Sequence, residues 1–199
     1  DIAQWAIGAQ DSGPVEIEGR ASSLPNDPFS YNVAPQFHAE MRYADGVRLV
    51  IATEGRNGLM LEGEKGRIFV NRGTLSGKLI DDLAASFGVS AKDLPFHPGV
   101  REKFYGIYPD DNPSHTLKAG KLDAIVNHMG NFFDCIRTRR PTISNVVCQH
   151  RSVSTCHLAN IAVRLGRKLR WDPAKEVFVG DAEADTWLRR EQRKGFEIA

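Results

Sequence analysis

The chain has few cysteines: only Cys135, Cys148 and Cys156 occur among its 199 residues. An odd number cannot pair completely within one chain, and their spacing matches no disulfide framework, so we expect a reducing compartment. The sequence also lacks an apolar run long enough to span a bilayer, and no signal peptide is visible. Because the chain opens at Asp1 without a methionine, we interpret its start as a cut within a longer protein. We therefore expect a cytoplasmic location by default, while an export signal on the parent protein stays open.

An excess of charge of one sign is absent as well. The sequence has 26 Lys and Arg against 25 Asp and Glu, for a formal net charge of +1. This balance gives no electrostatic reason to expect nucleic acid or an acidic membrane surface as a partner. Hydrophobic residues make up 41% of the chain, which is typical of a soluble globular protein.

Alternating apolar and polar residues predict β-strands in the first third of the chain. A short alternation covers residues 15–18, and a stronger one covers 37–43, followed by a turn at Gly46 and a returning strand over 47–53. Residues 59–63 and 67–71 predict a second hairpin. Two adjacent hairpins indicate an antiparallel core sheet.

Helices are predicted at both ends of the chain. Residues 1–8 indicate a short helix, 121–139 and 147–165 two long ones, and Asp181 is expected to be the N-cap of a terminal helix. The apolar residues of 121–139 recur at i, i+3 and i+4, so we expect this helix to lie on the core. The fold class predicted from this order is α+β: a large open mixed, mainly antiparallel sheet with helices packed on one face.

Between these regions, residues from about 72 to 120 contain little regular structure beyond a short helix predicted near 79–86. A stretch this long is usually a lid, a binding loop or an oligomer contact. We expect one domain over residues 1–199 that carries this stretch as a long loop insertion.

Several segments, taken in order, resemble the C-terminal domain of planctomycete-type Gfo/Idh/MocA oxidoreductases (glucose–fructose oxidoreductase, inositol dehydrogenase, MocA). Each motif is weak alone, and their order and spacing carry the resemblance. The segments are residues 1–8 (DIAQWAIG), 43–47 (YADGV), 63–66 (GEKG), 68–73 (IFVNRG), 131–136 (NFFDCI), 150–162 and 165–173.

The resemblance implies that cofactor binding and catalysis belong to a second domain. In this family an N-terminal Rossmann domain of the same polypeptide binds NAD or NADP, and no Gly-x-Gly-x-x-Gly follows a predicted strand in this chain. The family signature Asp-x-Gly-x-His-x-x-Asp ends at a residue that matches Asp1, so its catalytic His is expected three residues before the chain begins. The catalytic Lys of the family's Glu-Lys-Pro motif belongs to the missing half, whereas Lys65 is followed by Gly66 in a turn. We expect no catalytic residue and no bound cofactor in this chain, which is predicted to be inactive alone.

Two candidate substrate-binding residues lie in the opening helix. Asp1 falls one helical turn after the expected catalytic His, where it would orient that His or contact a substrate hydroxyl. The alternative is a carboxylate that only stabilises the helix start. Trp5 lies on the same face at i+4 and would stack on a sugar ring, or else pack in the core.

The remaining candidates lie in the predicted helix over 147–165. His150, Ser154 and His157 fall at i, i+4 and i+7 on one face, with Arg151 beside them. Such a polar stripe would line a substrate cleft, form a solvated face, or contact the Rossmann domain. The cysteine and histidine spacing of this region matches no structural zinc pattern, so no metal site is expected.

These observations leave three functional hypotheses. The first is the substrate-binding and oligomerisation half of an NAD(P)-dependent oxidoreductase acting on a sugar, polyol or related hydroxylated compound. The second is a relative in the same family that cleaves glycosidic bonds through transient oxidation by bound NAD. The third is a non-catalytic carbohydrate-binding or assembly module. Because an open sheet face must usually be covered, we also expect a homo-dimer or homo-tetramer through that face. His38, Glu40 and Arg42 alternate on one strand face, which indicates a polar sheet surface that is either solvated or between subunits.

Overall fold

The computed structural model describes residues 1–25, 29, 31–100 and 121–198. They form two compact units. Unit 1 comprises Asp1–Gly55 and Val146–Ala199, and unit 2 comprises Arg56–Asn145. Within the described part of the chain, no helix is both long and apolar enough to cross a membrane.

Unit 1 is built on a five-stranded sheet in the order β3-β2-β1-β7-β8, and every neighbouring pair is antiparallel. Its strands are β1 (Glu16–Ala21), β2 (Phe37–Arg42), β3 (Arg48–Ala52), β7 (Leu169–Asp172) and β8 (Val177–Phe178). The central strand β1 joins two parts of the chain far apart in sequence, because it pairs with β2 on one side and with β7 on the other.

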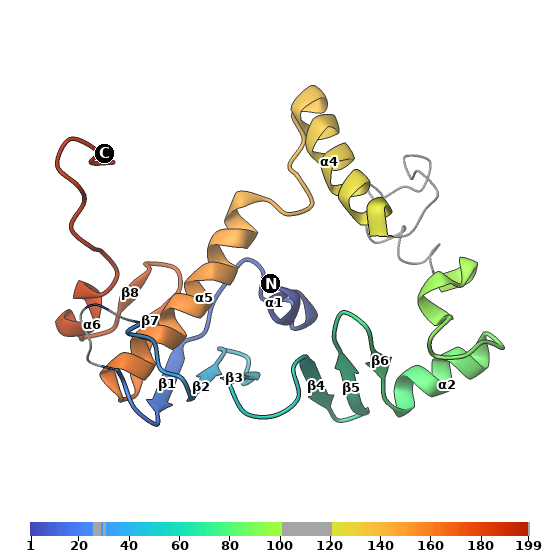
Figure 1. The fold of residues 1–199 in the computed structure, drawn as a ribbon, viewed down its shortest axis with the longest axis horizontal. Coiled ribbons are helices and arrows are strands. Elements are labelled where there is room, and N and C mark those ends of the chain that lie inside the picture. The colour runs from blue at the N-terminus through green and yellow to red at the C-terminus, as the bar shows by residue number, and fades with distance from the viewer. Residues whose placement is uncertain (26–28, 30, 101–120, 199) are drawn as a thin grey trace. The chain divides into compact units, whose positions relative to one another are not determined.

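One face of this sheet is covered by the long helix α5 (Val146–Leu165), which crosses β1 and β2 (Figure 1). The side chains of Ile17, Met41 and Ala162 in this layer are completely buried. Gly19 permits the close approach, since a Cβ atom at this position would lie 2.4 Å from the backbone nitrogen of Val163. The core of unit 1 is therefore the contact between one helix and one face of the sheet.

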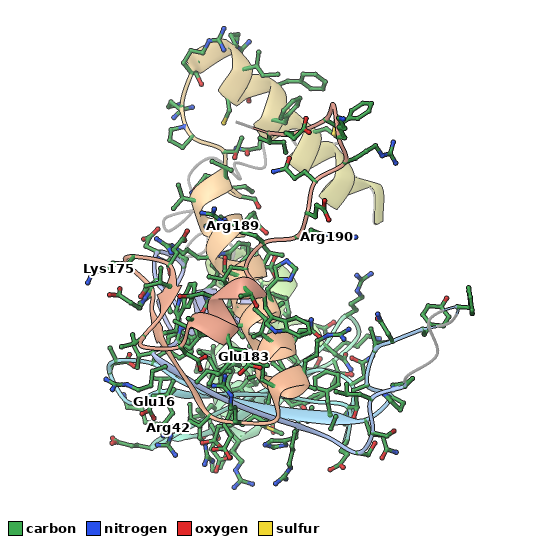
Figure 2. The ribbon with its side chains drawn as sticks, turned by 90° about the vertical axis from the view of Figure 1, so that its left-hand side faces the viewer. Glu16, Arg42, Lys175, Glu183, Arg189 and Arg190 are labelled. Atoms are coloured by element: carbon green, nitrogen blue, oxygen red, sulfur yellow. The ribbon has the colours of Figure 1, made fainter. Side chains whose placement is uncertain are left out.

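The opposite face of the sheet carries charged side chains. Because successive strand residues point to opposite faces, Glu16, Glu40 and Arg42 lie on the side away from α5. Figure 2 labels Glu16 and Arg42 near each other at this surface, in agreement with their pairing across β1 and β2. Arg42 donates to Glu40 over 3.1 Å, and a hydrogen bond from Lys168 lowers the pKa of Glu16. Among the described helices, none covers this charged face as extensively as α5 covers the opposite face.

Two short helices complete unit 1. Asp1 is the N-cap of α1 (Ile2–Ala6), where its carboxylate accepts from the Ile2 amide over 2.8 Å. Asp181 is the N-cap of α6 (Ala182–Thr186) and accepts from the Ala184 amide over 3.0 Å, which confirms the cap predicted from the sequence. Arg167 binds the same carboxylate, and this ion pair lowers the pKa of Asp181 to about 2.

Unit 2 contains a three-stranded antiparallel sheet in the order β4-β5-β6 and a small separate core. Its elements are β4 (Leu59–Gly63), β5 (Gly66–Val70), β6 (Leu75–Ser76), α2 (Lys78–Ser86), the 3-10 helix η1 (Leu94–Phe96) and α4 (Lys121–Thr138). Ile80, Ala84 and Leu94 are buried together in this core. The helix α2 confirms the short helix predicted within the 72–120 stretch, of which residues 101–120 lie outside the described part.

The predicted α+β class with a mainly antiparallel sheet and helices is confirmed. Two sequence expectations differ from the structure in detail. The second hairpin, β4–β5, does not belong to the main sheet. It forms a separate sheet in which β5 pairs with β6, the next strand along the chain. In α4, Met129 and Phe133 are 44% and 59% exposed, so the expectation that the whole apolar stripe faces a core is wrong for the described half of that helix.

Candidate functional site

A cleft with a volume of about 830 Å³ lies in unit 1. One wall is the outer side of α5, and another is the segment that follows α6. Its polar and aromatic lining is supplied by Asn32, His150, Ser154, His157, Asn160, Arg164, Trp171, Glu176, Trp187, Arg189 and Arg190. Pockets of this size suit a small-molecule ligand.

The predicted polar stripe of α5 lines this cleft. His150, Ser154 and His157 come to one side because i, i+4 and i+7 positions share a helix face. Leu158 and Ile161 of the same helix also line the cleft, and they belong to the core of unit 1. The spacing along α5 therefore places three polar side chains at the cleft, while Leu158 and Ile161 of the same helix pack in the core of unit 1.

Glu176 connects the β7–β8 hairpin to the start of α5. Its Oε1 atom lies 2.7 Å from His150 Nε2 and accepts from Arg151 Nη1 over 2.5 Å. Arg151 also donates to the carbonyl oxygen of Pro173 over 2.8 Å, so it clamps the hairpin at two points. Glu176 has a φ of 55°, a left-handed conformation that is unfavourable for most side chains and is held here by these contacts.

The hairpin that presents Glu176 is itself held by Asp172. The Asp172 carboxylate accepts from the amides of Ala174 and Lys175, each over 3.0 Å. These hydrogen bonds, led by the one from Lys175, lower the pKa of Asp172. Sequence reasoning missed Glu176, because nothing in the Pro-Ala-Lys-Glu turn indicates which helix its carboxylate reaches.

The far side of the cleft is basic and aromatic. Arg164 Nη2 donates to the carbonyl oxygen of Asn32 over 3.0 Å, and its guanidinium lies 5.8 Å from the centre of the Trp187 ring. Trp187 is 45% exposed, so its ring is accessible to a ligand. Arg189 and Arg190 follow it on the segment labelled in Figure 2.

The two candidates in α1 are not among the residues that line the cleft. Asp1 caps its own helix. Trp5 donates from Nε1 to Cys148 Sγ over 2.9 Å and is 41% exposed. Arg151 also does not line the cleft, but it positions Glu176, which does.

A buried polar contact supports α1 from beneath. The Tyr43 hydroxyl donates to Gln4 Oε1, and Gln4 is only 2% exposed. Burial raises the pKa of Tyr43 to about 12, against the opposing effect of a hydrogen bond with Thr155. The phenol is therefore a neutral structural donor and not an acid or base near neutral pH.

Candidate metal ligands do not cluster in the part of the chain that the structure describes. Over the described ranges, no three His, Cys, Asp or Glu side chains gather in one place. At the cleft only His150 and Glu176 meet, and Arg151 already shares the Glu176 carboxylate.

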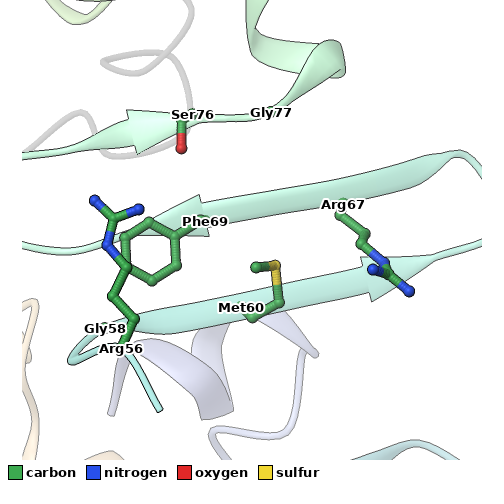
Figure 3. Close-up of a pocket in the computed structure, with 7 residues that line it drawn as sticks. All are labelled: Arg56, Gly58, Met60, Arg67, Phe69, Ser76 and Gly77. Carbon is green, nitrogen blue, oxygen red and sulfur yellow. The ribbon is translucent and has the colours of Figure 1, made fainter.

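A second, smaller cavity of about 380 Å³ lies in unit 2 among β4, β5 and β6 (Figure 3). Its most distinctive feature is the Arg56 guanidinium, 4.1 Å from the centre of the Phe69 ring. Arg67 also lines it but is bound to Glu62 over 2.8 Å. This cavity has no titratable acid or base besides the two arginines, so the cleft of unit 1 is the better candidate site.

Comparison with known proteins identifies the family. The model of the C-terminal alpha/beta domain of the Gfo/Idh/MocA oxidoreductase family matches residues 87–198, more than half of the chain. No curated protein and no solved structure shows significant similarity to the sequence. The chain belongs to this oxidoreductase family as its C-terminal domain.

Proposed function

We propose that this C-terminal domain of an oxidoreductase is the substrate-binding and oligomerisation half of an NAD(P)-dependent enzyme that acts on a sugar, a polyol or a related hydroxylated compound. One observation carries the proposal: Ser154, His157 and Asn160 of α5 line a single cleft with the exposed ring of Trp187. The family membership supplies the reaction type.

The cleft combines the groups that recognise carbohydrates. Hydroxyl, imidazole and amide side chains both donate and accept hydrogen bonds, as a polyhydroxylated ligand requires. No described residue is hydrogen-bonded to the side chains of Ser154, His157 or Asn160, so these three can turn to a ligand. The Trp187 ring offers an apolar face to the C–H side of a sugar.

In this proposal the chemistry of hydride transfer belongs to an N-terminal Rossmann domain of the same polypeptide. That domain binds NAD or NADP through a glycine-rich turn at a helix N-terminus, and the dinucleotide accepts the hydride from the substrate carbinol. A general base must take the carbinol proton, and the signature His expected three residues before Asp1 has that role. The present chain binds and orients the substrate and does not turn over alone.

The charged face of the main sheet is proposed as the surface between copies of the protein. Glu40 and Arg42 lie beside each other there, and Glu18 of β1 is paired in register with Glu40. A twofold interface would place such acidic and basic groups against each other. Light scattering after size-exclusion chromatography is expected to give a dimer or tetramer, and a monomer at high concentration would contradict this part of the proposal.

The enzymatic part is tested with the full-length parent protein. Reduction of NAD and NADP is followed by absorbance in the presence of a panel of sugars and polyols, and the 199-residue chain is assayed in parallel. We expect turnover only in the full-length protein. Ser154→Ala is expected to raise KM more than it lowers kcat, because the hydroxyl contacts substrate and not the reacting atoms. Ser144→Ala, which does not line the cleft, is the matched control.

Two outcomes would contradict this proposal. Turnover by the 199-residue chain alone would show that the chemistry does not need a partner domain. Release of sugar from a glycoside without net dinucleotide reduction would contradict a net oxidoreductase. It would indicate instead an enzyme that cleaves glycosidic bonds through transient oxidation.

A further inference from the structure

The cleft of unit 1 carries positive charge that its own residues do not neutralise. Arg164, Arg189 and Arg190 all line it. The hydrogen-bonding partner of Arg164 is the uncharged Asn32, through its carbonyl oxygen at 3.0 Å and its Oδ1 atom at 3.2 Å. Across the described residues, no carboxylate forms an ion pair with any of these three arginines.

Among the described residues that line the cleft, one is acidic, and it already has partners. Glu176 Oε1 is shared by His150 and Arg151 of α5, so the Arg151 guanidinium already balances its charge. Other arginines of unit 1 have acidic partners: Arg42 pairs with Glu40, and Arg167 with both Asp181 and Glu183. The chain as a whole has a net charge of only +1, so the three unpaired guanidinium groups are a local concentration of charge and not a general property.

We infer that the cleft binds a hydroxylated ligand that carries an anionic group, a carboxylate or a phosphate, recognised by Arg164, Arg189 and Arg190 while the α5 stripe contacts its hydroxyls. This inference rests on the proposed function in one respect, that the ligand is the substrate. Guanidinium groups present a planar fork of donors that matches carboxylate and phosphate oxygens in pairs. The ring of Trp187 lies against Arg164 and helps to hold one of the three forks in place.

The substrate class then becomes narrower than a sugar or polyol. A neutral sugar would leave three guanidinium groups in the cleft without a counter-charge, whereas a sugar acid or a sugar phosphate would neutralise at least one. A carboxylate and a phosphate share the chemistry that the site recognises. Comparing a sugar acid with a sugar phosphate distinguishes the two. The cleft of about 830 Å³ has room for a monosaccharide with either group.

The experiment measures binding to the 199-residue chain by titration calorimetry, with probes that differ only in charge. Glucose, glucuronate and glucose 6-phosphate form one series, myo-inositol and an inositol monophosphate a second, and inorganic phosphate is added alone. We expect at least one anionic member to bind about tenfold or more tightly than its neutral parent, because a charge-assisted hydrogen bond has that strength. Raising the salt concentration is expected to reduce this advantage.

The variants test which residues are responsible. The double variant Arg189→Gln with Arg190→Gln is expected to lose about tenfold or more in affinity for the anionic probe and to leave the affinity for its neutral parent within about twofold. Arg72→Gln removes an exposed arginine of unit 2 that does not line the cleft, and it is expected to change neither. Circular dichroism of each variant checks that the fold is retained.

The outcomes distinguish this inference from the proposed function. Equal binding of neutral and anionic probes, or an unchanged anion affinity in the double variant, would overturn the anionic ligand and leave a hydroxyl-binding cleft. Binding of inorganic phosphate that is as tight as that of the sugar phosphate, and that is unaffected by Ser154→Ala, would keep the anion site but contradict the substrate cleft. Absence of binding by every probe would overturn both.

Discussion

Gly19→Ala tests the contact on which unit 1 depends. Gly19 lies in the central strand β1 and faces α5, and a methyl group there would point at the backbone of the helix. The new Cβ would lie 2.4 Å from Val163 N and 2.7 Å from Ala162 C. Backbone atoms of a packed helix cannot rotate away as the end of a flexible side chain can, so the helix and the strand must separate.

The size of the effect follows from these distances. Carbon atoms in contact normally stay about 3.5–4.0 Å apart, so relieving the overlap requires a shift of roughly 1 Å. Such a shift opens the layer in which Ile17 and Met41 are completely buried. Overpacking of a well-packed core costs about 1–3 kcal/mol, and the lower entropy of the unfolded alanine chain offsets only part of it. We therefore expect Gly19→Ala to lower the free energy of unfolding by about 1–3 kcal/mol, or Tm by roughly 2–12 °C.

Tryptophan fluorescence during urea unfolding measures this change in the free energy of unfolding of unit 1. All three tryptophans, Trp5, Trp171 and Trp187, lie in unit 1, so their emission reports on its unfolding. Gly13→Ala, in the same unit, is the control, because a Cβ at Gly13 would meet its nearest neighbours, Pro173 and Trp171, only at ordinary contact distances of 3.6 Å and 3.9 Å. A Gly19→Ala variant as stable as the wild type would show that α5 does not pack directly against β1 and would refute the reasoning.

Three further predictions concern local interactions. The folded pKa of Asp181 is about 2, below the ordinary 3.8, so its stabilising ion pair is fully present above pH of about 4 and is lost as the pH falls through about 2. Asp181→Asn, which retains N-capping ability, should therefore flatten the dependence of Tm on pH across this window, and an unchanged pH profile would contradict the ion pair. Tyr43→Phe leaves Gln4 Oε1 buried without its donor and should lower the free energy of unfolding by about 1–3 kcal/mol in the same fluorescence assay, with no loss counting against that hydrogen bond. Gly130→Ala adds a methyl group in open space within α4 and should stabilise that helix by about 0.5–1 kcal/mol, seen as greater helical circular dichroism or slower amide exchange in α4, whereas a destabilised variant would indicate a contact at that position.

The candidate site was only partly predictable from the sequence. The i, i+4, i+7 spacing of His150, Ser154 and His157 predicted a shared face, and a cleft was one of three interpretations of it. Periodicity alone cannot tell a cleft wall from a solvated face, because both are polar. The segment carrying Arg189 and Arg190, which follows these residues by more than thirty positions, supplies the opposite side of the cleft. No spacing rule connects a helix to a segment that far away in the chain.

The features that were predictable from the amino-acid sequence are those that depend on neighbours within a few residues. Alternation along 37–43 and 47–53, the apolar side of α5 and the Asp181 cap all rest on local backbone geometry, and all appear in the structure. Which elements contact each other became known from the three-dimensional fold. The pairing of β1 with β7, the separate sheet of the second hairpin and the reach of Glu176 to α5 each join residues through space. Such contacts depend on the summed packing of the whole unit, and no short stretch of sequence encodes that sum.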